Sequence, residues 1–263
     1  MPNCFIIIGG QRCGTGWIAQ CLREHPDVSM APDETRFFDK KYRIAEPWWE
    51  FRSLKVASAD KVIGEKTANY LSDANVPRRI YSELPDVKIV CCLRNPVERF
   101  YSAFLMKAFR KPQLRSLPLK QLITEEPDLV TRGYYARHLS RYFEIFPVNN
   151  IHVSIYEDIK KAPDSFVQKI YGFVGVDFLF TPGSLYVQTK PGATEYRNRF
   201  LARYSRLLFS RKLPFLKIYN MIRKSPHGSH WAPWEKEFLI EIFDREISDV
   251  ESLLGRSLPE WRS

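Results

Sequence analysis

Apolar residues along the chain gather in short continuous runs, each followed by glycine, proline or charged residues. The clearest run, at residues 4–9, is rich in β-branched side chains and does not alternate with polar ones, and further runs typical of strands lie at residues 62–64, 87–93 and 151–155. Unbroken apolar runs of this length are typical of parallel strands that are buried on both faces. The pattern therefore predicts four such strands.

Between these runs the apolar positions follow a helical spacing. The spacing predicts helices at 17–25, 76–84, 97–109 and 164–174, a helical insert at 119–146, an irregular segment at 181–230, and a long amphipathic C-terminal helix at 233–254. Strands that alternate with helices imply right-handed crossovers and a parallel sheet with both faces covered. We therefore predict an α/β fold, with a single domain over residues 1–263 and a central parallel sheet flanked by helices.

Composition narrows the classes of partner and compartment. The 40 Lys and Arg residues against 30 Asp and Glu give a net charge of +10, which suits a nucleotide, a nucleic acid, an acidic glycan or a membrane surface. The five cysteines lack the spacing of zinc ligands or of a disulfide framework. No apolar run is long enough to span a bilayer. We therefore expect a cytoplasmic protein with no integral membrane segment and no metal.

The first predicted strand leads into a glycine-rich loop at residues 9–16 and then into a helix. Backbone N–H groups at such a helix start favour a phosphate, and Gly14 and Gly16 allow the backbone to approach it. Arg12 adds a positive charge and Thr15 a hydroxyl. The segment is a P-loop-like, phosphate-binding strand-loop-helix, although a glycine-rich turn that only connects strand to helix would look similar.

A P-loop kinase or NTPase is the competing enzyme class. Gly9 and Gly14 have its glycine spacing, but Thr15 and Gly16 stand where that motif requires Lys and Ser or Thr. The third strand ends at Arg94 instead of a metal-binding Asp. The residues indicate a site that holds phosphate with protein cations and without Mg²⁺.

Several motifs together resemble the sulfotransferases that use 3′-phosphoadenosine-5′-phosphosulfate (PAPS), above all the heparan sulfate N- and 3-O-sulfotransferase branch and its bacterial relatives. Residues 7–15 (IIGGQRCGT) resemble the family's 5′-phosphosulfate loop, with Arg12 where the family usually has Lys. Residues 92–102 (CLRNPVERFYS) resemble its 3′-phosphate motif. Further similar segments are DETRFF at 33–38, EKTANY at 65–70, GYYA at 133–136, YED at 156–158 and LPEW at 258–261.

The resemblance implies a role for each matching residue. Glu34 would be the general base, and Arg12 and Lys66 would stabilise the charge that develops on the departing phosphate. Arg94 and Ser102 would hold the 3′-phosphate, and the product would be 3′-phosphoadenosine 5′-phosphate (PAP). The complete set expected to bind the cofactor is Gln11, Arg12, Cys13, Gly14, Thr15, Gly16, Trp17, Arg94, Ser102, Lys190 and Arg197.

Three questions stay open at the level of sequence. A histidine could replace Glu34 as the base, with His230 beside Trp231 as the second choice. The acceptor could be a glycan, including an acidic saccharide, or another hydroxylated metabolite. The oligomeric state of the protein is the third open question. A nucleic-acid-binding module using the basic residues of segment 197–212 is the alternative outside the enzymes, but it leaves Arg94 and the glycine loop unexplained.

Overall fold

The computed structural model describes residues 3–40, 42, 48, 61–186 and 233–263. Its centre is a parallel sheet with the strand order β2-β3-β1-β4-β5. The strands are β1 (Cys4–Gly9), β2 (Val28–Met30), β3 (Val62–Lys66), β4 (Lys88–Leu93) and β5 (Ile151–Ile155). The predicted α/β fold with a central parallel sheet is confirmed, and β2 is a strand that the hydrophobic pattern did not predict.

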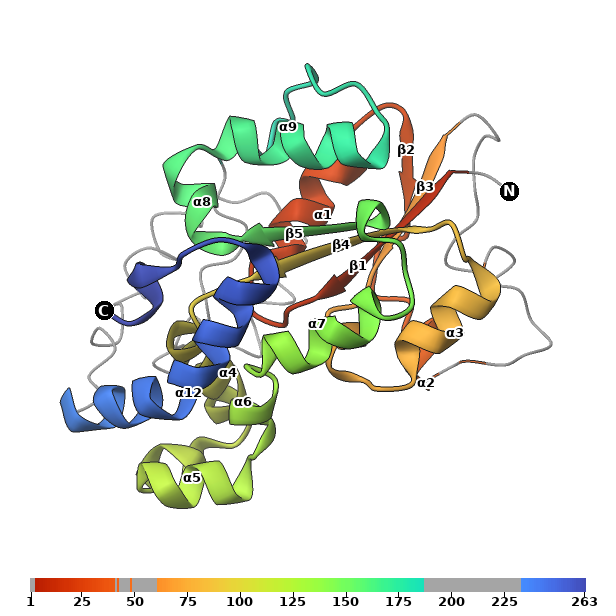
Figure 1. Cartoon of the computed structure of the whole chain (residues 1–263). Helices are drawn as coiled ribbons and strands as arrows, with labels where there is room; N and C mark the ends of the chain where they lie inside the picture. Colours follow the sequence, from red (N-terminus) through yellow and green to blue (C-terminus); the bar gives the residue numbers. More distant parts are fainter. Residues whose placement is uncertain (1–2, 41, 43–47, 49–60, 187–232) are drawn as a thin grey trace, which may run out of the picture.

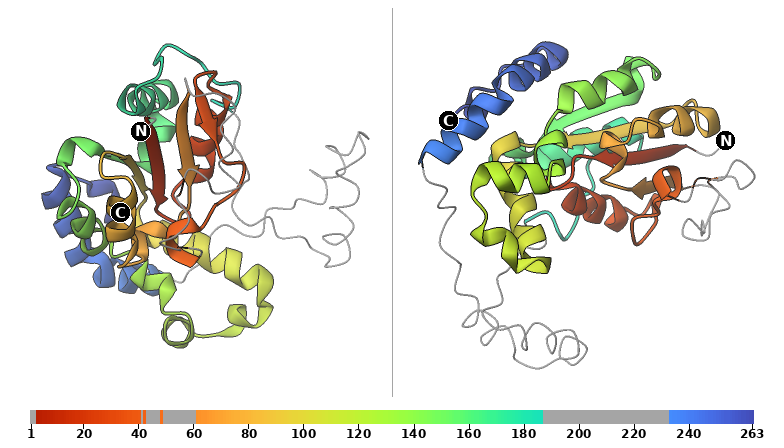
Figure 2. Two further views of the ribbon diagram at one scale, coloured as in Figure 1. Left: turned by 90° about the vertical axis from the view of Figure 1, so that its right-hand side faces the viewer. Right: turned by 90° about the horizontal axis from the view of Figure 1, so that it is seen from below.

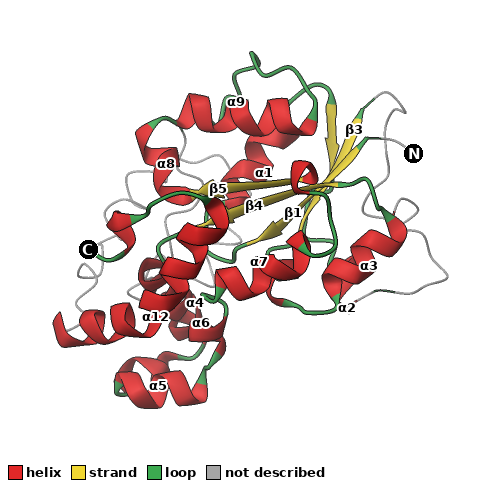
Figure 3. Cartoon of the chain, in the orientation of Figure 1, coloured by secondary structure: helices red, strands yellow, loops and turns green. Residues whose placement is uncertain are grey.

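Helices cover both faces of the sheet. Figures 1 and 2 show α1 and α9 on one face and α3 and α7 on the other, and Figure 3 marks the loops between them. The helices are α1 (Thr15–Glu24), α2 (Phe37–Lys40), α3 (Val76–Glu83), α4 (Pro96–Arg110), α5 (Leu119–Glu125), α6 (Asp128–Thr131), α7 (Tyr135–Phe143), α8 (Tyr156–Lys161), α9 (Pro163–Val174) and α12 (Pro233–Leu254). The expected insert at 119–146 is thus three short helices, divided where Pro127 and Gly133 interrupt the helical pattern.

The core forms where the continuous apolar runs meet. Residues 5–8 of β1 and 89–93 of β4 are fully buried, as their unbroken hydrophobic pattern predicts. The last helix packs Leu239, Phe243 and Ile247 into the same core. Its apolar stripe therefore attaches the C-terminal part of the chain to the domain.

The strand register aligns the carboxyl ends of the strands along one edge of the sheet. Ile7 of β1 pairs with Lys66 of β3, Gly9 pairs with Cys91 of β4, and Leu93 pairs with Ile155 of β5. The chain moves from β1 to one side of the sheet and later returns to the other side at β4. In such sheets the crevice at this switch point, between β1 and β4, is where ligands bind.

Candidate functional site: a cationic crevice at the switch point

The glycine loop after β1 presents unused backbone donors at the start of α1. Gly14 has a left-handed φ of 81° and is the N-cap, so the helix begins at Thr15, two residues earlier than its apolar spacing indicates. Within the described part of the chain, the N–H groups of Gly14, Thr15 and Gly16 donate to no recorded acceptor. Three adjacent donors at the positive end of a helix dipole form an anion-binding arrangement.

Arg12 lies in the same loop and lacks a carboxylate partner among the residues that the structure describes. Its Nε donates to Ser102 Oγ of α4 at 2.9 Å, which joins two residues predicted for the site across 90 positions. Burial, together with the nearby positive charge of Arg94, lowers the pKa of Arg12. Two partly buried guanidinium groups that repel each other favour the binding of an anion between them.

Arg94, at the end of β4, adds the second cation. Its guanidinium stacks over the ring of Tyr156 with 4.8 Å to the centroid, and Nη2 contacts Glu98 at 3.2 Å. Its Nε is buried and has no hydrogen-bond partner among the described residues. An unsatisfied donor on a buried charged group is costly, and a phosphate oxygen would satisfy it.

Glu34 and Lys66 form an ion pair beside this crevice. Lys66 ends β3, and its Nζ lies 2.7 Å from Glu34 Oε1, with 20% and 35% of the two side chains exposed. Glu34 also accepts a weaker bond from the backbone N–H of Ala68 at 3.4 Å. The structure therefore brings together the predicted base and the predicted cation, although they are 32 residues apart in sequence.

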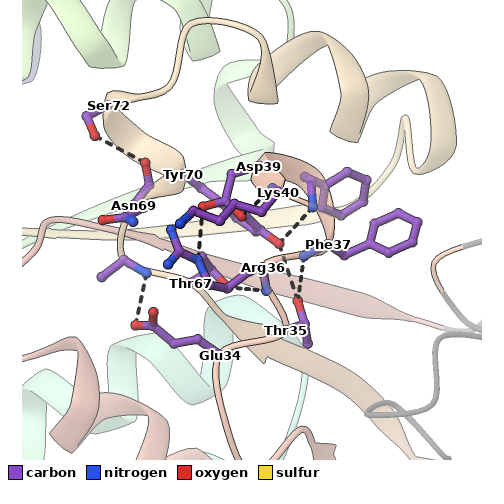
Figure 4. A network of polar contacts seen from close by, with 12 residues as sticks. Glu34, Thr35, Arg36, Phe37, Asp39, Lys40, Thr67, Asn69, Tyr70 and Ser72 are labelled. Carbon is purple, nitrogen blue, oxygen red and sulfur yellow. Dashed lines mark hydrogen bonds and ion pairs between the residues drawn. The ribbon is translucent and has the colours of Figure 1, made fainter. Parts of the chain in front are cut away.

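The segment that carries Glu34 is fixed by the turn after β3. Figure 4 shows Glu34 beside this turn and Thr35 directed toward Tyr70. The backbone N–H of Arg36 donates to Thr67 Oγ1 at 3.2 Å, and that of Phe38 donates to the hydroxyl of Tyr70 at 3.0 Å. Because these contacts anchor the backbone that directly follows Glu34, its carboxylate is held at the carboxyl edge of the sheet.

With this geometry in hand, comparison with known proteins identifies the family. The family model described as "Sulfotransferase domain" matches residues 2–190. Human heparan sulfate glucosamine 3-O-sulfotransferase 6 is 30% identical over 194 residues, which cover 71% of this chain and 56% of that protein. The chain belongs to the sulfotransferase family. It spans about half the length of the curated 3-O-sulfotransferases that it matches.

Solved sulfotransferase structures have the same fold. The crystal structure of a sulfotransferase from Alicyclobacillus acidocaldarius superposes with a TM-score of 0.69 at 21% identity, over 100% of this chain and 99% of that one. A mouse sulfotransferase complexed with PAP gives a TM-score of 0.53 at 19% identity, over 97% and 87% of the two chains. The mouse bifunctional heparan sulfate N-deacetylase/N-sulfotransferase 1 is 29% identical over 191 residues, which cover 65% of this chain and 22% of that protein.

The side chains of Cys13 and Trp17, two further residues predicted for the cofactor site, contact other parts of the protein. The Cys13 side chain is fully buried, with Sγ 3.7 Å from the hydroxyl of Tyr135, and burial raises the pKa of its thiol to about 11. Trp17 Nε1 donates to the carbonyl of Ser184 at 3.1 Å, so its ring faces the 182–185 turn. Gln11 is half-buried in the loop. Lys190, Arg197 and His230 lie outside the described residues.

Tyr156 contacts the candidate site, although its sequence motif gave it no separate role. It opens α8 directly after β5, and its ring supports the guanidinium of Arg94. A Cβ atom on Gly14 would lie only 2.8 Å from the same ring. The sequence signal that could have found it is its position at the carboxyl end of a buried strand.

Among the described residues, membrane-spanning helices and metal-binding clusters can both be assessed. No helix among them is long and apolar enough to cross a membrane. No three His, Cys, Asp or Glu side chains in these ranges lie close enough together to hold a metal ion.

Two glycines of the loop offer a matched pair of substitutions. Gly14→Ala places a side chain at φ 81° and against Tyr156, so we expect a loss of about 1–3 kcal/mol of stability. Gly16→Ala meets no atom within 4 Å and should keep or slightly raise the melting temperature, because alanine favours helix. A methyl group at this position should nevertheless hinder the close approach of a phosphate to the backbone N–H groups at the start of α1. Isothermal titration should therefore show weakened PAP binding for Gly16→Ala, and an unchanged Kd would contradict a phosphate at this position.

Proposed function

We propose that the protein is a sulfotransferase that moves the sulfuryl group of PAPS to a hydroxyl or amine of a saccharide. The observation that carries this proposal is the pair of cations beside the glycine loop. Arg12 and Arg94 lie together at the switch point, Arg12 has no carboxylate partner among the described residues, and three neighbouring backbone N–H groups have no acceptor in the same part of the chain. A ligand with phosphates at two ends, such as PAPS, matches this set of donors.

The residues present fit the donor nucleotide. The buried Nε of Arg94 and the hydroxyl of Ser102 would hold the 3′-phosphate. Since Ser102 Oγ already accepts a hydrogen bond from Arg12, its own O–H is free to donate to a phosphate oxygen. The N–H groups of Gly14, Thr15 and Gly16 would hold the 5′ end, and binding energy at the 3′ end would position the reacting group.

Bound PAPS would supply an activated sulfuryl group with a good leaving group. Lys66 and Arg12 carry the positive charge that stabilises negative charge on the leaving phosphate. Glu34, held by the 67–70 turn, accepts the proton of the acceptor hydroxyl or amine. Its ion pair with Lys66 keeps the base and the cation in one arrangement, with both side chains still partly open to solvent.

A saccharide is the acceptor class that the similar proteins favour. The relatives named above act on heparan sulfate, and the net charge of +10 suits an acidic polymer. Transfer of radiolabelled sulfate from PAPS to heparan-type oligosaccharides, to neutral oligosaccharides and to simple phenols should therefore be greatest with the first. A preference for phenols would overturn the acceptor class and leave the donor site intact.

The donor site is tested by thermal-shift and calorimetric titration of wild type and Arg94→Ala. PAP should stabilise the wild-type protein more than 5′-AMP or Mg-ATP does. At a PAP concentration of 100 times its Kd, the free energy of unfolding should rise by about 2.7 kcal/mol. Arg94→Ala should weaken PAP by about 10–100-fold, the value of a lost charged hydrogen bond. Arg110→Ala, which removes an exposed arginine from the last residue of α4, controls for net charge. Stabilisation by Mg-ATP alone would favour the kinase alternative.

A further inference from the structure

The peptide that joins Arg94 to Asn95 is held at both of its polar atoms. The hydroxyl of Tyr135 donates to the carbonyl of Arg94 at 3.0 Å. On the other side, the N–H of Asn95 donates to Glu157 Oε1 at 3.1 Å. Because both bonds are in place, the peptide plane cannot rotate, and the direction in which the Arg94 side chain leaves the backbone is fixed.

Both partners of this peptide pack against one residue from the end of the chain. Trp261 is fully buried, and its Nε1 donates to Glu157 Oε2 at 3.2 Å. Its ring lies 6.0 Å from the ring of Tyr135, between centroids. Glu157 thus uses one carboxylate oxygen for the Arg94–Asn95 turn and the other for the C-terminal tryptophan.

Asn95 adds a second connection between the turn and the C-terminal segment. Its Oδ1 caps α4 by accepting from the N–H groups of Val97 and Glu98 at 2.9 and 3.3 Å. Its Nδ2 donates to the carbonyl of Glu260 at 3.3 Å. Both the Oδ1 and the Nδ2 of this buried side chain therefore have hydrogen-bond partners, and the C-terminal turn supplies the partner of Nδ2.

We propose that Glu157 is a positioning residue of the donor site: with Trp261, it orients Arg94 toward the 3′-phosphate. This inference rests on the proposed function. It concerns a carboxylate without an ion-pair partner among the described residues, close to a site that would bind an anion. If Glu157 acted only through its negative charge, removing that charge would strengthen the binding of PAP. If it positions Arg94, removing it would weaken the binding of PAP.

Glu157→Gln separates these two effects. Glutamine has the same shape, but its amide NH₂ would face a donor, either the N–H of Asn95 or Nε1 of Trp261. If the residue acted only through its charge, losing it would tighten PAP binding. Because it positions Arg94, we expect Glu157→Gln to weaken PAP by about tenfold, the scale of a misplaced binding group. Affinity for 5′-AMP, which lacks the 3′-phosphate, should stay within about twofold.

The control variant lies next to it on the same helix. Asp158→Asn breaks the two-pronged ion pair with Arg256, at 2.5 and 2.8 Å, and also removes one negative charge. It should lower the melting temperature but keep the wild-type ratio of PAP to 5′-AMP affinity. Trp261→Phe keeps an aromatic ring beside Tyr135 but removes the Nε1 donor and some buried volume, so it should lower the melting temperature and also lower that ratio in the same direction as Glu157→Gln.

The experiment is calorimetric titration of PAP and 5′-AMP into the full chain of each variant. A lowered affinity ratio in Glu157→Gln and Trp261→Phe, with a normal ratio in Asp158→Asn, is the expected result. Unchanged or tighter PAP binding in Glu157→Gln would overturn the positioning role, while a wild-type preference for PAP would leave the proposed function standing. If wild type itself does not prefer PAP, the proposed function fails and this inference fails with it.

Discussion

Replacing Glu34 with glutamine should lower kcat by about 10²–10⁴-fold, the usual contribution of a general base, with little change in PAP affinity. The carboxylate lies beside Lys66 at the carboxyl edge of the sheet, whereas the proposed phosphate contacts come from the glycine loop and from α4. Glutamine retains an oxygen that can accept from Lys66 Nζ. A partly exposed ion pair contributes only about 0–1 kcal/mol, so the fold should survive the change.

The measurement is the rate of sulfate transfer to heparan-type oligosaccharide at saturating PAPS, beside the Kd of PAP. Asp33→Asn is the matched control, since it removes an exposed carboxylate one residue away and should leave kcat near the wild-type value. If Glu34→Gln retained more than about one-third of kcat, the base would have to be sought elsewhere, with His230 as the next candidate. If PAP affinity fell as much as kcat, Glu34 would act in binding.

The parts of the fold that local pattern predicted are those with strong local signals. Strands β1 and β4 are largely apolar runs, and their burial follows directly, whereas β3 is apolar only over its first residues and β5 alternates with His152 and Ser154. β2 has only three residues, of which Val28 alone is buried, so its pattern is too short to stand out. It forms because it pairs with β3, and the N–H of Ala31 continues that ladder to Gly64.

In the candidate site, too, residues with a strong local sequence signal could be predicted and residues placed by tertiary packing could not. The glycine loop and Arg94 could be predicted because each directly follows a buried strand, and strand ends meet at one edge of a parallel sheet. The contacts of Glu157 could not be, because its partners Asn95 and Trp261 are 62 and 104 residues distant in sequence. Proximity of that kind arises from how α8 and the C-terminal turn pack, and no local periodicity encodes it.

Glu65 is a further residue whose environment was unpredictable, and it should make stability depend on pH. It is fully buried in β3, where Trp48 Nε1 and the Tyr70 hydroxyl both donate to Oε1 at 3.1 Å. Its other oxygen is buried without a partner among the described residues. Burial raises the pKa of Glu65 to about 8, so the folded protein holds this proton where the unfolded chain has released it.

The direction of the effect follows from that proton. Between the ordinary glutamate pKa of 4.5 and about 8, the folded state binds more protons than the unfolded state, so the free energy of unfolding falls as pH rises. At about 1.4 kcal/mol for each pKa unit, the total is on the order of 5 kcal/mol at most. The contribution is fully present below pH 4.5 and is lost as pH rises through the folded pKa of about 8.

Urea unfolding of wild type and Glu65→Gln across this range isolates the contribution of Glu65, because all other titrating groups cancel in the difference. The variant should gain stability relative to wild type by several kcal/mol between about pH 5 and pH 9. Glu237→Gln on the exposed face of α12 controls for the loss of one carboxyl group. A difference that does not change with pH would mean that Glu65 titrates alike in both states.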